Sequence, residues 1–152
     1  MVLSAQILPN LWLGNILDAR NKEFMEKIDV VINCSKNIPF YSKKSLNIRI
    51  RVNDDLTELE ITNLYKYLHN VTAVIHKHLR DNKIVLVHCY AGKQRSASIV
   101  CAYIMRYLNI SYIEATDLMR SKRSVVFMPL PNFDSALKLY QENLNKMSKL
   151  NT

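Results

Sequence analysis

The sequence has few residues that break or crosslink a chain. Its 152 residues include two glycines and four prolines, and no stretch rich in proline, glycine or serine that would serve as a linker. Three cysteines, an odd number, argue against the disulfide framework of a secreted protein. The sequence has no run of 18 apolar residues, and its beginning shows neither the basic nor the apolar segment of a signal peptide. We therefore expect a protein of the cell interior with no transmembrane segment.

Length and composition favour one domain. A chain of this length with 49% hydrophobic residues can bury a full core but leaves no room for a second domain. We expect this domain over residues 1–147, followed by a short polar tail over residues 148–152. We expect a monomer in the cytoplasm, with the nucleus as a further compartment and the host cytosol if the source is viral.

Short apolar runs alternate with longer amphipathic segments, which predicts an α/β fold of three layers with helices on both faces of a largely parallel sheet. Strands are expected at residues 7–8, 11–13, 30–33, 46–52 and 84–87, and helices at 16–27, 58–80, 96–108, 112–121 and 133–146. Thr57 with Glu60, and Ser111 with Glu114, have the spacing of capping boxes at two helix starts. The functional site of such a sheet lies at the carboxyl edge of its strands.

A chemically distinctive segment follows the buried strand expected at 84–87 and leads into the next helix. It reads His88-Cys89-Tyr90-Ala91-Gly92-Lys93-Gln94-Arg95-Ser96. In this strand-to-helix turn, the backbone N–H groups from Tyr90 to Arg95 would surround a phosphate, and the Arg95 guanidinium would bind it with two hydrogen bonds. The same positive potential lowers a cysteine pKa to about 3.5–7.5, which predicts a thiolate at Cys89.

This segment resembles the signature of the cysteine-dependent protein tyrosine phosphatases: histidine and cysteine, five residues, arginine, then serine or threonine. From about residue 7 to residue 144 the chain is similar to the small atypical dual-specificity phosphatases, on residues 7–14, 29–33 and 102–105 as well as on the signature. The resemblance implies the cysteine phosphatase fold, with about five mostly parallel strands, and a catalytic domain over residues 1–147. It also implies hydrolysis of phosphotyrosine, phosphoserine and phosphothreonine in proteins.

The resemblance assigns catalytic roles to four residues. Cys89 is the nucleophile, Arg95 binds the phosphoryl oxygens together with the loop from Tyr90 to Gln94, and Ser96 donates a hydrogen bond to the sulfur. Asp54 is the expected general acid, because the leaving oxygen must be protonated as the P–O bond breaks. Asp55 is the alternative acid, and it also lies close enough to the next helix to cap it. His88 is expected to brace the loop.

Net charge and two departures from the family pattern bear on the substrate. A net charge of +8 predicts attraction to polyanionic phosphorylated ligands. Lys93-Gln94 replaces the apolar residue and serine common in the family, and Ala-Gly-Lys resembles the lipid-directed branch of the superfamily. Phosphatases of phosphoinositide headgroups and of RNA 5′ ends are therefore alternatives, and a non-catalytic phosphate-binding module is the alternative outside enzymes. Pro131-Asn132-Phe133 replaces the family's Pro-Asn-x-Gly-Phe and predicts a loop of different shape.

Three further residues have open roles. Arg123 matches a stretch that lines the pocket rim in related phosphatases, where it would bind a neighbouring phosphate; the alternative is an exposed helix end. Cys34 ends the strand expected beside the loop and is a possible disulfide partner for oxidised Cys89, with a buried inert thiol as the alternative. Cys101 is expected to be a small core residue. The four histidines lack metal-ligand spacing, so we expect no metal and no cofactor.

Overall fold

A central sheet organises the computed structural model, which describes residues 4–150. Its five strands are β1 (Ala5–Leu8), β2 (Leu11–Gly14), β3 (Val30–Asn33), β4 (Leu46–Arg49) and β5 (Val85–His88). They lie in the order β1-β2-β5-β3-β4, with β1 antiparallel to β2 and every other pair parallel. This arrangement confirms the mostly parallel sheet predicted from the sequence.

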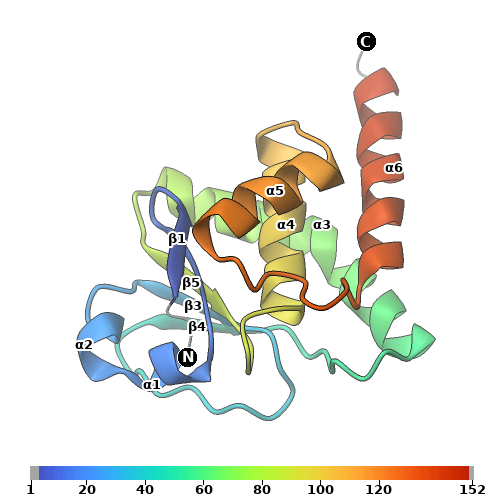
Figure 1. The fold of residues 1–152 in the computed structure, drawn as a ribbon. Coiled ribbons are helices and arrows are strands. Elements are labelled where there is room, and N and C mark those ends of the chain that lie inside the picture. The colour runs from blue at the N-terminus through green and yellow to red at the C-terminus, as the bar shows by residue number, and fades with distance from the viewer. Residues whose placement is uncertain (1–3, 151–152) are drawn as a thin grey trace.

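Helices cover both faces of the sheet (Figure 1). They are α1 (Ile16–Arg20), α2 (Lys22–Met25), α3 (Glu58–Arg80), α4 (Arg95–Tyr107), α5 (Tyr112–Lys122) and α6 (Asp134–Leu150). Alternate residues of the central strands point to opposite faces. Val85 and Val87 of β5 pack with the layer of α3 to α6, whereas Leu86 packs with α1 and α2. The predicted three-layer α/β fold is therefore confirmed.

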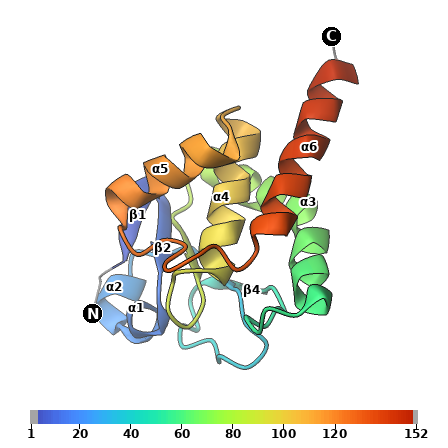
Figure 2. The same cartoon turned by 45° about the vertical axis from the view of Figure 1, so that its right-hand side comes forward.

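Helix α4 forms the middle of the larger helical layer. Figure 2 shows it between α5 on one side and α3 and α6 on the other. Ten consecutive residues from Ser96 to Met105 are buried, which explains why this helix is apolar on nearly all sides. Because α4 also packs against β5, the loop that joins these two elements is anchored at both ends in the core.

The segment 16–27 differs from the sequence prediction of one helix. Asn21 is extended, with φ −79° and ψ 110°, so that α1 ends before it and α2 begins after it. Its side-chain oxygen accepts a hydrogen bond from the Phe24 N–H, which caps α2. Asparagine favours such caps because its side chain competes with the helical backbone for hydrogen bonds.

Two other elements end where the sequence did not predict. Strand β4 stops at Arg49 instead of residue 52, because Val52 N–H bonds back to the Ile50 carbonyl and turns the chain away from the sheet. Helix α6 continues to Leu150 and so includes residues 148–150 of the predicted polar tail. The remaining residues of that tail, 151 and 152, lie outside the described residues.

One of the two predicted capping boxes is complete. Ser111 and Glu114 bond to each other's backbone N–H groups at the start of α5. At the start of α3, the Thr57 hydroxyl accepts from Glu60 N–H, but the Glu60 carboxylate does not reach back. Asp55 accepts from Thr57 N–H in its place, so the expected reciprocal contact of Glu60 is wrong and its carboxylate binds elsewhere.

The packing of α3 predicts unequal effects of two leucine truncations. Leu68 is a fully buried residue of α3. Leu68→Ala should therefore lower the free energy of unfolding by about 3 kcal/mol, because contacts are lost and a cavity forms. Leu59 lies on the same helix and is 78% exposed, so Leu59→Ala is the matched control, with an expected change within about 0.5 kcal/mol. Urea denaturation would measure both, and equal losses would contradict this description of the core.

Candidate active site

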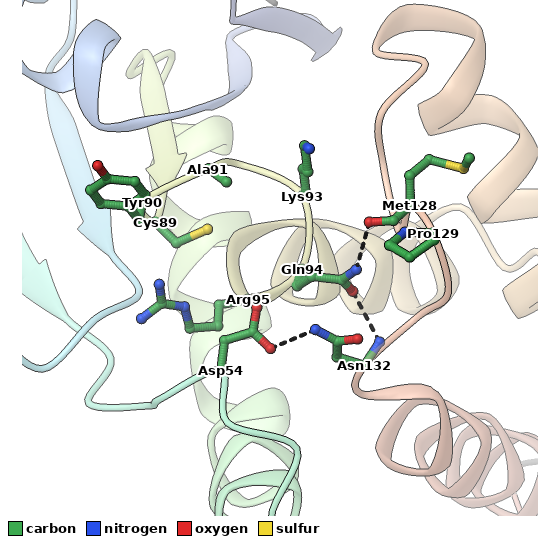
Figure 3. A pocket seen from close by; sticks show the side chains of 10 residues that line it. All are labelled: Asp54, Cys89, Tyr90, Ala91, Lys93, Gln94, Arg95, Met128, Pro129 and Asn132. Atoms are coloured by element: carbon green, nitrogen blue, oxygen red, sulfur yellow. Dashed lines mark hydrogen bonds between the residues drawn. The ribbon is translucent and has the colours of Figure 1, made fainter.

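The loop between β5 and α4 places the Cys89 thiol at the base of a pocket (Figure 3). The side chain is buried, and its sulfur accepts a hydrogen bond from Gly92 N–H at 3.3 Å. Ser96 Oγ, in the first turn of α4, lies 3.1 Å from the same sulfur. The thiol therefore sits between a backbone N–H and a hydroxyl at the N-terminus of a helix, where the helix dipole favours negative charge.

Gly92 has a conformation that other residues rarely adopt. Its φ is +67°, and a Cβ atom added there would contact the Gly14 carbonyl oxygen and lie 2.9 Å from the Arg123 guanidinium. Backbone and a buried cation close the space that a side chain would need. Glycine at this position therefore allows the tight turn that the sequence predicts around a phosphate.

Arg95 begins α4 and lines the same pocket. One of its terminal nitrogens donates to the Val52 carbonyl at 3.3 Å, while its Nε is buried and has no hydrogen-bond partner among the described residues. A buried guanidinium N–H without a partner is costly unless a ligand satisfies it. The side chain is thus held from one side and has bonding capacity left for an anion.

The structure places Asp54 and Asp55 differently. Asp54 lines the pocket of Cys89, and its Oδ1 accepts a hydrogen bond of 2.7 Å from the Asn132 amide (Figure 3). Asp55 accepts from the Thr57 N–H and hydroxyl, and these bonds lower the pKa of its carboxyl. Asp55 therefore stabilises the start of α3, and Asp54 is the carboxylate that faces the thiol across the pocket.

Gln94 has a structural role that the sequence did not indicate. Its buried amide donates to the carbonyls of Met128 and Leu130 at 3.2 and 2.9 Å, and its oxygen accepts from Asn132 N–H at 3.0 Å. Gln94 thereby fastens the segment 128–132 to the loop and forms one wall of the pocket. The only sequence signal was that Gln94 departs from the family's usual serine.

Lys93 lies at the mouth of the pocket. Figure 3 shows its side chain directed away from the Cys89 sulfur, with Ala91 beside it in the loop and Tyr90 at the opposite end. The pocket has a volume of about 410 Å³. A cation at its mouth adds positive potential for an approaching anion without contacting the thiol.

Arg123 is buried behind the loop, which excludes the exposed helix end given as the alternative, while its role at the pocket rim stays a prediction. Only 2% of the residue is exposed, and its guanidinium donates to the Gly92 and Ala91 carbonyls, each at 3.0 Å. Burial lowers its pKa, while the nearby Asp18 and Cys89 raise it. These two hydrogen bonds of Arg123 fix the orientation of two peptide groups of the loop.

His88 and the two remaining cysteines are buried around the loop. One ring nitrogen of His88 lies 3.2 Å from the Cys89 carbonyl, and burial lowers the His88 pKa to about 4. Cys34 N–H donates to the His88 carbonyl at 2.8 Å, and burial together with the charge of Cys89 raises the Cys34 pKa. Burial raises the pKa of Cys101 to about 12, which fits the core position expected for it.

Comparison with known proteins identifies the family of this site and fold. Residues 11–143 match the family described as dual specificity phosphatase, catalytic domain. A putative tyrosine phosphatase, 123R of Invertebrate iridescent virus 6, is 36% identical over 141 residues, which are 92% of this chain and 93% of that one. Human dual specificity protein phosphatase 9 is 34% identical over 134 residues, 85% of this chain, and this chain spans about a third (33%) of its length.

Solved structures agree with this result. Human DUSP28 has a TM-score of 0.83 with 28% identity, over 93% of this chain and 95% of that one. A mouse putative dual specificity phosphatase complexed with zinc tungstate has a TM-score of 0.86 with 28% identity, over 97% and 92%. The chain belongs to the dual-specificity phosphatase family, and the predicted enzyme class is confirmed.

Residues 4–150 contain neither a membrane-spanning helix nor a group of metal ligands. None of the helices there is both long enough and apolar enough to cross a membrane. Within the same range, no three His, Cys, Asp or Glu side chains are grouped so that they could bind a metal ion.

The buried His88 predicts that acid destabilises the fold. Because the His88 pKa is about 4 in the folded chain and 6.5 in the unfolded chain, the unfolded state binds more protons between these values. The free energy of unfolding should fall by up to about 3 kcal/mol from pH 6.5 to pH 4 and be constant above pH 7 for this group. Urea denaturation at pH 7, 5.5 and 4.5 measures it.

Two variants separate His88 from other acid effects. His88→Gln should flatten the pH dependence, whereas His69→Gln, which changes an exposed histidine on α3, should leave it unchanged. A slope that persists in His88→Gln would show that other groups cause the acid sensitivity.

Proposed function

We propose that this chain hydrolyses phosphotyrosine, phosphoserine and phosphothreonine in proteins through a thiophosphate intermediate on Cys89. The observation that carries the proposal is the position of the Cys89 sulfur. It lies at the base of a pocket between Gly92 N–H and the Ser96 hydroxyl, at the start of α4. A thiolate held in this way is stabilised as a nucleophile by hydrogen bonds and by the helix dipole.

In the first step, the Cys89 thiolate attacks phosphorus and forms a P–S bond while the P–O bond to the substrate breaks. Asp54 gives its proton to the leaving oxygen, so that an alcohol or phenol departs instead of an unstable alkoxide. The geometry that supports this role is the carboxylate position across the pocket from the sulfur, where the Asn132 amide fixes one oxygen. The other oxygen is left to carry the proton.

Arg95 and the loop amides stabilise the charge of the phosphoryl oxygens. The buried Nε of Arg95, which has no partner among residues 4–150, and the N–H groups at the start of α4 are positioned before substrate arrives. Such preorganised donors favour the transition state because they need no reorganisation when charge develops. The mouse relative was solved in complex with zinc tungstate. Tungstate is a tetrahedral oxyanion like phosphate, so this complex agrees with anion binding by the fold.

In the second step, water attacks phosphorus, Asp54 takes a proton from that water, and the P–S bond breaks to release inorganic phosphate and the thiolate. Ser96 donates a hydrogen bond to the departing sulfur and so improves it as a leaving group. Asp54 thus serves first as acid and then as base.

Protein substrates fit the charge of the chain. A net charge of +8 favours acidic segments around a phosphorylated residue, and Lys93 adds a cation at the mouth of the pocket. We infer a cytoplasmic enzyme that acts on phosphorylated proteins. Phosphoinositides and RNA 5′ ends are the alternative substrates if phosphopeptides are not hydrolysed.

The proposal predicts the activity of two variants on a substrate panel. Phosphate release is measured from a phosphotyrosine peptide, a phosphothreonine peptide, a phosphoinositide and a 5′-triphosphate RNA. Cys89→Ser should abolish turnover of the peptides, and Asp54→Asn should lower kcat by about 10²-fold or more, the usual contribution of a general acid. Asp55→Asn is the matched control and should lower it much less.

Covalent trapping tests the intermediate directly. Acid quench during turnover of a ³²P-labelled phosphopeptide should leave label on wild-type protein and none on Cys89→Ser. Turnover confined to the lipid or the RNA would replace the protein substrate, and absence of label with every substrate would overturn the enzyme mechanism.

Cys34 supports a second, redox proposal about the same thiol. Peroxide oxidises the Cys89 thiolate to a sulfenic acid, and the Cys34 thiol then attacks its sulfur, forming a disulfide and releasing water. The hydrogen bond from Cys34 N–H to the carbonyl of His88, the residue before Cys89, supports the proximity of the two cysteines.

Peptide mass spectrometry after peroxide treatment measures the result. We expect a Cys34–Cys89 linked peptide and recovery of activity with thiol reductant, with Cys101→Ser as a control that still forms the link. Over-oxidised Cys89 without the link would overturn this redox role.

A further inference from the structure

Glu60 has a buried carboxylate with three partners and no assigned role. The residue lies in the first turn of α3 and is only 4% exposed. Its Oε2 accepts from Asn53 N–H at 2.8 Å and lies 2.8 Å from Lys36 Nζ, and its Oε1 accepts from the Asn63 amide at 3.0 Å. A buried carboxylate with these bonds is a built feature of the fold, because an unpaired one would be too costly.

The partners of Glu60 belong to separate segments at the carboxyl edge of the sheet. Lys36 follows β3, Asn53 lies in the segment between β4 and α3, and Asn63 is one turn further along α3. The Asn63 amide also donates to the Arg51 carbonyl at 2.7 Å. The Glu60 carboxylate therefore ties the segment that carries Asp54 to both α3 and the β3 side of the sheet.

Ionisation strengthens this anchor. Burial raises the pKa of the Glu60 carboxyl, but the hydrogen bonds of its partners outweigh burial and leave the pKa below its ordinary value. Hydrogen bonds to an ionised group are about twice as strong as those between neutral groups. The Glu60 carboxylate accepts from donors at both of its oxygens, whereas glutamine has one accepting oxygen and an NH2 group that would face one of these donors.

We propose that Glu60 is a positioning residue for proton transfer by Asp54. Asp54 follows Asn53 directly, so the bond from Asn53 N–H to Glu60 fixes the backbone from which the Asp54 side chain extends. Asp54 is itself exposed, and its described side-chain bond is to Asn132 on a different segment. This inference rests on the proposed role of Asp54 as general acid. Without Glu60, the acid keeps its chemistry but loses its fixed position.

The test compares substrates that need the acid to different extents. Phenyl phosphate has a basic leaving group that must be protonated, whereas p-nitrophenyl phosphate releases a weakly basic one. We expect Glu60→Gln to lower kcat about tenfold or more with phenyl phosphate and less than about threefold with p-nitrophenyl phosphate, because a small displacement impairs only the proton transfer. Retained turnover of p-nitrophenyl phosphate shows that the variant is folded.

A matched control removes the same charge from the same turn. Glu58 is exposed in the first turn of α3, so Glu58→Gln alters the helix end equally and should leave both kcat values near wild type. Glu60→Asp keeps the charge but shortens the side chain by one methylene. It serves as the second variant if Glu60→Gln does not fold, and we expect the same selective loss with phenyl phosphate.

Asp54→Asn distinguishes this inference from the proposed function. If Asp54→Asn loses phenyl phosphate turnover selectively and Asp54→Asn/Glu60→Gln loses no more, Glu60 acts through Asp54. If Asp54→Asn shows the loss but the folded Glu60 variants do not, the positioning role is overturned and the general acid stands. If Asp54→Asn itself shows no selective loss, the acid assignment fails, and the positioning role fails with it.

Discussion

The loop between β5 and α4 turns at Gly92, where the Gly14 carbonyl and the Arg123 guanidinium occupy the space beside the α carbon. This close fit fixes the direction of the peptide groups in the loop, because Arg123 binds the carbonyls of Ala91 and Gly92 from behind. With these carbonyls held, Gly92 N–H is free to bond the Cys89 sulfur on the opposite side. The chemistry of the pocket depends on this backbone conformation, since the donors for an anion are main-chain groups.

The other walls of the pocket are coupled to the same loop. Gln94 connects it to the segment 128–132, and Asn132 connects that segment to Asp54. Arg95 connects the loop to the Val52 carbonyl, two residues before Asp54. The thiol and the carboxylate therefore lie on different segments that share hydrogen bonds on both sides of the pocket. The proposed two-step reaction needs a fixed distance between them, because in that reaction the same carboxylate reaches both the leaving oxygen and the attacking water.

The sequence predicted the parts of this site that depend on local structure. A buried strand, a glycine and an apolar helix in direct succession specify the loop around Cys89, and short apolar runs separated by amphipathic helices specify the parallel sheet. The prediction of one helix over residues 16–27 was wrong because Asn21 ends α1 and caps the start of α2. Helix propensity alone does not distinguish a capping asparagine from one inside a helix.

Side-chain contacts between segments far apart in the chain could not be predicted from the sequence pattern. Arg123 bonds to residues about 30 positions earlier, and Gln94 to residues more than 30 positions later, so their spacing carries no periodic signal. Glu60 was assigned to a capping box because its spacing from Thr57 fits one, but its carboxylate binds Asn53 and Lys36. A local rule identified the right residue and the wrong partner, because the tertiary fold offered the carboxylate two stronger donors.

The pocket contains a buried N–H group of a cationic side chain that has no hydrogen-bond acceptor among the described residues, and this lowers the stability of the fold. The described structure leaves the Nε of Arg95 without a partner and directs the N-terminus of α4 into the same pocket. Buried donors without acceptors destabilise a folded chain by about 1–3 kcal/mol each. The apolar layers on both faces of the sheet, with α4 buried over ten consecutive residues, offset this loss. In the proposed function, the groups with this unmet bonding capacity are the ones that bind the phosphoryl group.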